Sequence, residues 1–215
     1  MIQNQVGFVL KRFYPLKSKI TVLSMHAGKY DLIFKKFDDC LNLWPGMLVS
    51  FTTEQTQNTM FGANTKILVN PNIHTEQSIY LMHHILEICN LFIPYDKPCP
   101  EIFDFLKKFM ILIDSEYIPE KHLTYAHKIF TAKLISLFGF CSHNPILTYL
   151  AIYETLTTTF VDFSQEQKVE FWEKHLRPIR EKYLDECILE KWILEHLKIH
   201  PQSGQLKTIP FVYKH

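Results

Sequence analysis

The sequence predicts an α+β fold, with a small N-terminal β-barrel followed by an all-helical C-terminal domain. Apolar and polar residues alternate up to about Asn72, whereas apolar residues recur at helical spacing from about Thr75 onward. Glycines and prolines separate the segments. A hydrophobic fraction of 47% over 215 residues is typical of chains with a packed core. We therefore expect a barrel over residues 1–73 and helices over 74–215.

The barrel is predicted from five short segments. Val6, Phe8 and Leu10 alternate with more polar neighbours, and residues 20–25 are rich in β-branched side chains. A turn at 27–29 precedes a third alternating segment over 30–37, in which Leu32 and Phe34 share one face. Residues 47–53 and 64–69 form the fourth and fifth segments, with a polar loop at 55–58 between them. Closure into a barrel would remove the exposed edges of such short strands.

Helices are predicted from spacing and end signals. Thr75 is placed to cap a first helix that Pro94 ends, and Pro100 opens a second. Pro119 opens a third helix that ends at Gly139, and Pro145 begins a fourth. Ser164 and Gln167 have the spacing of a capping box for a fifth helix. A last helix is expected through 189–197, followed by an irregular tail after 201.

Compartment and membrane topology follow from composition. The five cysteines are odd in number and widely spaced, and the N-terminus lacks the pattern of a secretory signal. These features favour free thiols in a reducing, cytoplasmic environment. The stretch 134–153 contains no charged residue, but Gly139 and Pro145 interrupt it, so two short buried helices are expected and no membrane span.

A basic strand region interleaved with aromatic residues is the main functional signal. Up to Thr75 the chain has eight basic and four acidic residues, a net charge of +4, while the remainder has 15 basic and 18 acidic residues, a net charge of −3. Single-stranded nucleic acid needs cations for phosphates and flat rings for bases. The alternative is that the rings fill the barrel and the lysines only solubilise it. The residues that we predict to bind DNA are Lys11, Arg12, Lys17, Lys19, Lys29, Tyr30, Lys35 and Lys36.

Only three arginines occur, so contacts to phosphate with little sequence preference are expected. His83, His84 and Glu87 share one helical turn without the zinc-protease spacing, and half-buried histidines are the simpler interpretation. Cys89 with Cys99, and Cys141 with His143, offer too few ligands for a structural zinc site. No motif for nucleophilic catalysis or phosphate cradling occurs, so we expect no enzyme activity, no cofactor and no metal. An enzyme that uses a thiol or the His83 group is kept as the least favoured hypothesis.

Five strings, in order, resemble the RecO family of bacterial recombination and repair mediators. The first is Val6-Gly-Phe-Val-Leu10-Lys-Arg-Phe-Tyr-Pro15 and continues to Lys29, resembling the family's opening strand pair and hairpin. Two further strings are similar to the family's first and second helices after the barrel. They are Ile79-Tyr-Leu-Met-His-His-Ile-Leu-Glu87 and Cys99-Pro-Glu-Ile-Phe103-Asp-Phe-Leu106. The last two are Phe130-Thr-Ala-Lys-Leu134 with its continuation to Phe140, and His175-Leu-Arg-Pro-Ile179.

The resemblance implies an oligonucleotide-binding (OB) barrel and a helical domain that together bind and anneal single-stranded DNA, also bind double-stranded DNA, and associate with the nucleoid. It further implies docking of the acidic tail of single-strand-binding protein, and cooperation with RecR to load RecA. The chain departs from the family where Asp38 and Asp39 interrupt the basic run after the third strand. Some members carry a four-cysteine zinc site, but only Cys141 is present here, so zinc is not expected.

Docking an acidic tail with apolar residues requires an apolar pocket with cations at its rim. The residues that we predict to bind this partner are Lys128, Phe130, Lys133, Leu134, Arg177 and Arg180, with ordinary solvated helix charges as the alternative. Two functions are carried forward: a RecO-like mediator that binds DNA, and a protein-docking scaffold of the same architecture with little DNA binding.

Overall fold

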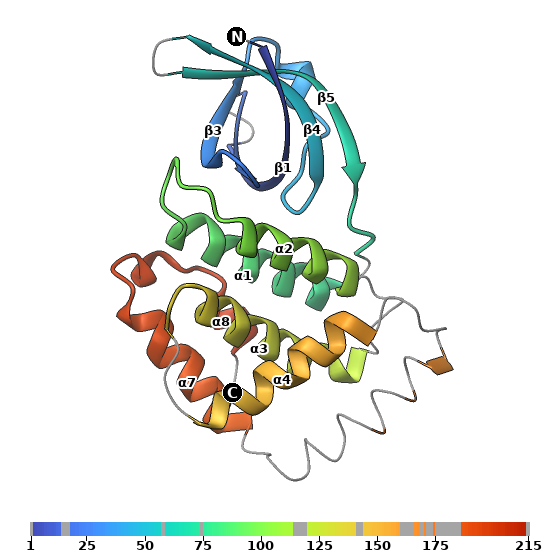
Figure 1. Cartoon of the computed structure of the whole chain (residues 1–215), viewed down its shortest axis with the longest axis vertical. Helices are drawn as coiled ribbons and strands as arrows, with labels where there is room; N and C mark the ends of the chain where they lie inside the picture. The colour runs from blue at the N-terminus through green and yellow to red at the C-terminus, as the bar shows by residue number, and fades with distance from the viewer. Residues whose placement is uncertain are drawn as a thin grey trace. The chain divides into compact units, whose positions relative to one another are not determined.

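The computed structural model describes residues 2–13, 18–56, 59–73, 75–113, 120–140, 144–159, 166–167, 170, 174 and 186–213. It confirms the α+β class, with a closed five-stranded barrel followed by helices (Figure 1). The chain divides into two compact units. The barrel unit consists of Met1–Pro71 with Met82–Lys107, and the second unit of Asn72–Leu81 with Lys108–His215.

Strand order around the barrel is β1-β2-β3-β5-β4. The strands are β1 (Ile2–Arg12), β2 (Lys19–Ser24), β3 (Gly28–Phe34), β4 (Leu48–Thr56) and β5 (Thr59–Val69). All neighbours are antiparallel except β3 and β5, which pair in parallel only at Ile33–Phe61 and Phe34–Gly62. The short 3-10 helix η1 (Phe37–Cys40) follows β3. Two residue pairs therefore close the barrel.

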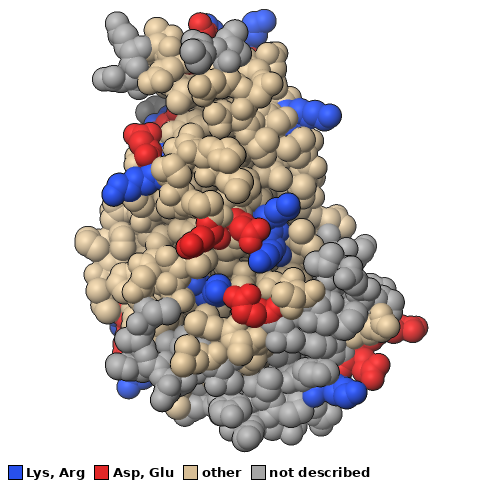
Figure 2. All heavy atoms as spheres, viewed as in Figure 1, with Lys and Arg blue, Asp and Glu red and all other residues tan. Residues whose placement is uncertain are grey.

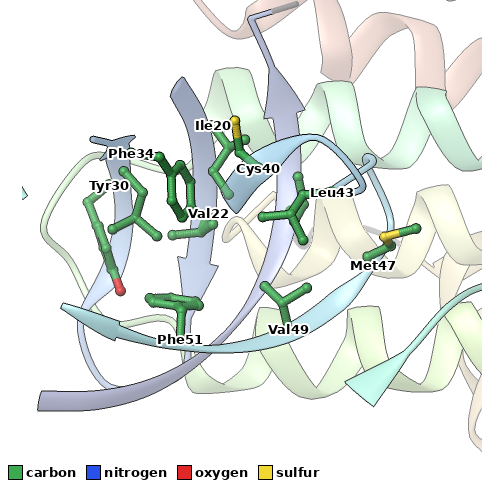
Figure 3. Packing of buried hydrophobic residues seen from close by; sticks show 11 residues of the cluster. Ile20, Val22, Tyr30, Phe34, Cys40, Leu43, Met47, Val49 and Phe51 are labelled. Atoms are coloured by element: carbon green, nitrogen blue, oxygen red, sulfur yellow. The ribbon is translucent and has the colours of Figure 1, made fainter. Parts of the chain in front are cut away.

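The barrel interior is filled by side chains from every second position of the strands, together with Cys40, Leu43 and Met47 from the segment between β3 and β4 (Figure 3). Leu32 is fully buried and Phe34 is 3% exposed, whereas Ile33 between them is exposed, as the alternation predicted. Tyr30 belongs to the same interior cluster. The alternation thus identified the inward face of β3 correctly. Tyr30, which we predicted to bind DNA, lies on this inward face.

Residues 82–107 join the barrel because particular contacts hold them there. The ring centroids of Phe8 and Phe103 lie 5.1 Å apart. Gly28 has a φ of +79°, and a Cβ at this position would lie 2.2 Å from the carbonyl oxygen of Lys97. Only glycine therefore lets the chain at Lys97 approach so closely. The barrel unit thus includes a helical segment outside the predicted range of 1–73.

Two helices follow β5, α1 (Glu76–Phe92) and α2 (Pro100–Leu112). Thr75 caps α1 as predicted, because its hydroxyl accepts a hydrogen bond from the backbone N–H of Ser78 at 3.1 Å. Helix α1 ends two residues before Pro94, which has no N–H to continue it, and α2 begins at Pro100. The local end signals were therefore correct.

The second unit contains α3 (Glu120–Leu137), α4 (Asn144–Thr159) and α7 (Glu186–Ile199). Helix α3 packs against both α4 and α7. Gly139 follows α3 with a φ of +87°, the backbone conformation that favours glycine at a helix C-terminus. The predicted fifth helix, with Ser164 and Gln167, falls largely outside the described residues.

The tail after Pro201 contains two further short helices, η4 (Ser203–Gln205) and α8 (Ile209–Val212), so the prediction of an irregular tail was wrong there. Tyr213 is 8% exposed, and Phe211 stacks on Tyr80 with ring centroids 5.2 Å apart. Burial of Tyr213 and the stacking of Phe211 on Tyr80 stabilise a segment whose sequence lacks helical periodicity. Among the described residues, no helix has both the length and the apolarity needed to cross a bilayer.

Candidate nucleic-acid interface

Two lysines lie close to one aromatic ring where β1 ends and β2 begins. The ammonium nitrogens of Lys11 and Lys19 lie 4.8 Å and 4.7 Å from the ring centroid of Phe13. Lys11 is exposed and ends in solvent, and Phe13 is half-buried. The last residues of β1 pair with the first of β2, where Lys11 registers with Thr21 and Arg12 with Ile20, so the connection between these strands starts and ends here. We call Lys11, Phe13 and Lys19 the β1–β2 cluster.

A second cation–ring pair lies beside this cluster in sequence. The Arg12 guanidinium carbon is 4.5 Å from the ring centroid of Trp44, and Trp44 is 51% exposed. The indole holds the plane of the guanidinium in place, but both terminal nitrogens of Arg12 are buried. The prediction that Arg12 binds DNA is therefore not supported by its position. Trp44 precedes Pro45 and Gly46, a turn that keeps the indole at the surface.

A groove of about 400 Å³ lies on the outside of the barrel, where β4 and β5 meet the chain after β3. Lys35, Lys36 and Phe61 give it cations and a ring, and the Lys35 ammonium is 5.4 Å from the Phe61 ring centroid. Asp39 and Glu54 also line the groove. The remaining lining residues are Thr52, Thr53, Gly62, Ala63 and Asn64. The groove therefore combines hydroxyl and amide groups with charges of both signs.

Two residues that we predicted to bind DNA are not available at the surface. Lys29 is 3% exposed; its ammonium donates to the carbonyl oxygen of Asn90 at 2.6 Å and lies 4.4 Å from the Tyr95 ring centroid. Burial lowers the pKa of this ammonium, against the opposing effect of Asp31. Tyr30 is 5% exposed in the barrel interior, where burial raises the pKa of its hydroxyl. Their assignment to DNA was wrong, because both side chains hold the barrel unit together.

Carboxylates accompany two of the remaining cations. Lys19 pairs with Asp31 at 2.6 Å, and Lys35 pairs with Glu54 at 3.2 Å. On the face drawn in Figure 2, acidic side chains lie close to basic ones among the described residues, so this face carries no broad surface of one sign. Lys36 is exposed beside the groove, and Lys17 lies outside the described residues. Among the cations that the structure describes, the arrangement is therefore one of small groups and not one continuous basic strip.

The predicted rim for an acidic tail is not formed as expected. Lys128 is 6% exposed and pairs with Glu190 at 2.7 Å, while Phe130 and Leu134 are almost completely buried in the core of the second unit. Phe130 contacts the rings of Phe109 and Tyr153 at centroid distances of 5.3 Å and 5.2 Å. The assignment of Lys128, Phe130 and Leu134 to a docking surface was therefore wrong, because these residues stabilise the contacts of α3 with its neighbours.

Lys133 remains partly exposed, but its ammonium donates to Glu154 at 2.7 Å and lies 5.1 Å from the Tyr153 ring centroid. Arg177 and Arg180 lie outside the described residues. No cationic rim around a pocket can be built from this set within the part of the chain that the structure describes.

His84 and Cys89 of α1 are completely buried. His84 is fully buried, and burial lowers its pKa to about 3, so the imidazole is neutral at physiological pH. Burial also raises the pKa of Cys89, which disfavours a reactive thiolate. Among the described residues, no group of three or more histidine, cysteine or acidic side chains could hold a metal ion. Cys141 and His143 lie outside the described residues.

Sequence reasoning did not identify Trp44 and Phe61 as surface rings near cations. A signal existed for Trp44, since an aromatic residue directly before Pro-Gly is placed at a turn. Phe61 carried no such signal, because its position beside Lys35 depends on the two-residue pairing of β3 with β5. The chain matches no protein-family model and no curated protein.

Proposed function

We propose that the chain is a RecO-like DNA repair and recombination mediator, in which an OB-fold barrel binds and anneals single-stranded DNA. The observation that carries this proposal is the β1–β2 cluster, where the ammonium nitrogens of Lys11 and Lys19 lie 4.8 Å and 4.7 Å from the centroid of the half-buried Phe13 ring. Flat rings stack on bases and cations contact phosphates, the two requirements of sequence-independent binding to a single strand.

The topology of the barrel supports an OB fold. Five strands in the order β1-β2-β3-β5-β4 close into a small, mostly antiparallel barrel. OB folds are five-stranded, partly open barrels that bind oligonucleotides on strands 2 and 3 and on the loops between strands 1 and 2 and between strands 4 and 5. The β1–β2 cluster lies at the ends of the first of these loops. Thr52, Thr53, Glu54 and Phe61, which line the groove, lie close to the ends of the second.

A single strand could therefore contact two sets of cations. Lys11 and Lys19 would contact phosphates beside the base that stacks on Phe13. Lys36 would contact phosphates at the groove, where Phe61 offers a second ring. Annealing requires two polyanions in one place, and each neutralised phosphate lowers their repulsion.

Residues 74–215 form, in this proposal, an all-helical domain that docks partners. Docking of the tail of single-strand-binding protein, binding of RecR and loading of RecA rest on the resemblance of the five strings to the RecO family. Because Lys128, Phe130 and Leu134 are buried, a tail would need a surface other than the one first assigned to it.

Fluorescence anisotropy with a labelled oligothymidine tests the DNA-binding proposal. If three phosphates are neutralised, the logarithm of the association constant should fall by about 2 for each tenfold rise in salt, since each phosphate on a single strand contributes roughly 0.7. Lys11→Gln combined with Lys36→Gln should lower this slope. Lys97→Gln, an exposed lysine outside both sets, is the control. Binding that does not depend on salt, or no binding at low salt, would contradict the proposal.

A second candidate function is a protein-docking scaffold with little DNA binding. The Lys19–Asp31 and Lys35–Glu54 pairs and the burial of Lys29 favour it, because they remove cations from the set that DNA would use. Anisotropy with a synthetic tail peptide of single-strand-binding protein separates the two functions. The scaffold should bind this peptide and leave oligonucleotides unbound at low salt, whereas the mediator should bind both.

A further inference from the structure

The groove on the outside of the barrel brings a carboxylate, a cation and an aromatic ring together. Glu54 and Phe61 are directly opposite each other in the antiparallel pairing of β4 with β5, so their side chains lie on the same face of the sheet. The Lys35 ammonium is 3.2 Å from a carboxylate oxygen of Glu54 and 5.4 Å from the Phe61 ring centroid. All three residues line the groove and belong to the barrel unit.

The charges that line the groove are balanced, which suits a neutral ligand better than an anion. Lys35 and Lys36 bring two positive charges, and Asp39 and Glu54 bring two negative charges. Phe61 is half-buried, so a flat molecule can stack on the part of its ring that remains accessible. Unpaired bases are bound in this way, by stacking on an aromatic ring and by hydrogen bonds to their edges. The groove therefore has the groups that a nucleobase requires.

The Lys35–Glu54 pair presents a particular order of hydrogen-bonding groups. The ammonium donates and the carboxylate oxygens accept, so the pair offers a donor beside two acceptors. The pairing edge of guanine is the complement of this order, with an acceptor at O6 and donors at N1 and at the 2-amino group. Adenine and cytosine each have a single amino donor on this edge. Thymine has one N–H donor between two carbonyl oxygens, which a carboxylate repels.

We propose that this groove binds an unpaired guanine base of a DNA strand. The base stacks on Phe61, its N1 and 2-amino groups donate to Glu54, and its O6 accepts from Lys35. The inference rests on the proposed function, because the strand that carries the guanine is the one that the β1–β2 cluster holds. It goes beyond that function, because it gives the barrel a preference for one base.

Exposure makes the ion pair available to a ligand. The side chains of Lys35 and Glu54 are 68% and 54% exposed. Exposed pairs of this kind contribute little to stability, so little is lost when the edge of a base replaces part of the contact between them. A duplex hides the pairing edge of guanine, whereas an unpaired base exposes it. The groove therefore selects single strands as well as guanine.

The wall of the groove is held by the structure of β5. The β4–β5 register shifts between Ser50 and Thr52, and Asn64 on β5 has a φ of +52°. The Asn64 amide donates to the Thr52 hydroxyl at 3.2 Å, and this hydroxyl donates to the carbonyl oxygen of Ala63 at 3.0 Å. These bonds order the wall before a ligand binds, which lowers the entropic cost of binding.

Fluorescence anisotropy with two short labelled strands tests the inference, one of oligothymidine and one with a single guanine at its centre. The guanine strand should bind at least about fivefold more tightly, the lower end of what a bidentate contact to a base contributes. Glu54→Gln should abolish this preference, because the amide replaces an acceptor with a donor and keeps the size of the side chain. Hypoxanthine, which lacks only the 2-amino group of guanine, should lose part of the preference.

Glu101→Gln is the matched control, because Glu101 is also an exposed carboxylate of the barrel unit and does not line the groove. Each variant removes one negative charge and should raise the affinity for both strands alike. Only Glu54→Gln should change the ratio of the two affinities. A preference that survives Glu54→Gln, or one that both variants abolish, would overturn the inference. Circular dichroism checks that both variants fold.

Failure of the guanine site and failure of DNA binding give different results. If oligothymidine binds and the guanine adds nothing, the strand-binding proposal stands and the guanine site is wrong. If neither strand binds, nuclear magnetic resonance with mononucleotides decides. Guanosine monophosphate at millimolar concentration should shift the backbone amide signals of Glu54 and of residues 61–64 in the wild type and not in Glu54→Gln, and thymidine monophosphate should shift neither. Such shifts would support the site with a free nucleotide as its ligand, and their absence would overturn it.

Discussion

The two compact units each contain a short lysine–carboxylate pair, and the two pairs differ mainly in their contact with water. In the barrel unit Lys19 and Asp31 are 2.6 Å apart with side chains 27% exposed, whereas in the second unit Lys128 and Glu190 are 2.7 Å apart with side chains 7% and 8% exposed. The exposed pair is weak and can exchange partners, while the buried pair is costly to break. Almost equal distances therefore do not imply equal energies, and only the exposed lysine can bind a ligand.

The largest effect is expected from breaking the buried pair. Lys128→Met should lower the free energy of unfolding by about 3–5 kcal/mol, because it removes the ammonium that pairs with the buried Glu190 carboxylate at 2.7 Å. The double variant Lys128→Met with Glu190→Leu should recover most of this loss. Urea unfolding followed by circular dichroism measures both. A loss below about 1 kcal/mol for the single variant would show that water reaches the pair, and the contrast with the barrel unit would disappear.

The next effect concerns a buried titratable group within the barrel unit. The pKa of His84 is lowered to about 3 in the folded chain, against about 6.5 when unfolded. Above pH 6.5 both states are neutral at this site. As the pH falls below 6.5, His84 becomes protonated in the unfolded chain but stays neutral in the folded chain. The free energy of unfolding therefore falls by up to about 1.4 kcal/mol per pH unit.

Urea titrations at pH 6 and pH 4 measure this dependence, which should amount to about 2–3 kcal/mol from His84 between these values. His84→Leu should lose less stability than the wild type over the same interval, while His26→Leu, in an exposed turn, should behave like the wild type. Equal pH dependence in all three proteins would show that His84 does not remain neutral in the folded chain as the pH falls.

A smaller effect should follow from removing the Phe13 ring, which lies close to the ammonium groups of Lys11 and Lys19. Phe13→Leu keeps an apolar side chain but loses stacking, which is worth about 1–3 kcal/mol per base, so oligothymidine affinity should fall about tenfold or more. Phe211→Leu removes a ring that is 51% exposed in the second unit and should leave affinity unchanged. Anisotropy measures both. If the two variants lose affinity equally, the barrel has no special part in binding.

The smallest effect tests whether the exposed pair restrains the barrel. Asp31→Asn removes a negative charge beside Lys19 but keeps an oxygen that can accept the hydrogen bond that Thr21 now donates at 2.7 Å. Oligonucleotide affinity should rise a few-fold, while the free energy of unfolding should change by less than about 1 kcal/mol. A fall in affinity would mean that Asp31 orders Lys19 for binding, which would reverse its assigned role.

The sequence alone determined the elements whose signals are local. The alternation around Leu32 and Phe34, the cap at Thr75 and the glycine at 139 were all correct, because strand facing and helix ends depend on residues a few positions apart. The proximity of the residues in the β1–β2 cluster could also be predicted from the sequence. Lys11, Phe13 and Lys19 lie at the facing ends of consecutive strands, where adjacency in sequence gives adjacency in space.

Only the tertiary structure decided which charges and rings are buried. Lys29 contacts Asn90, which lies 61 positions along the chain, and Lys128 pairs with Glu190 from another helix. Neither lysine differs in its local pattern from one that ends in solvent. Burial is set by all the atoms that pack around a side chain, and most of these come from distant segments. Sequence periodicity therefore identifies the inward face of a strand, but whether a lysine on that strand meets water, a carbonyl oxygen or a nucleic acid depends on contacts that periodicity does not encode.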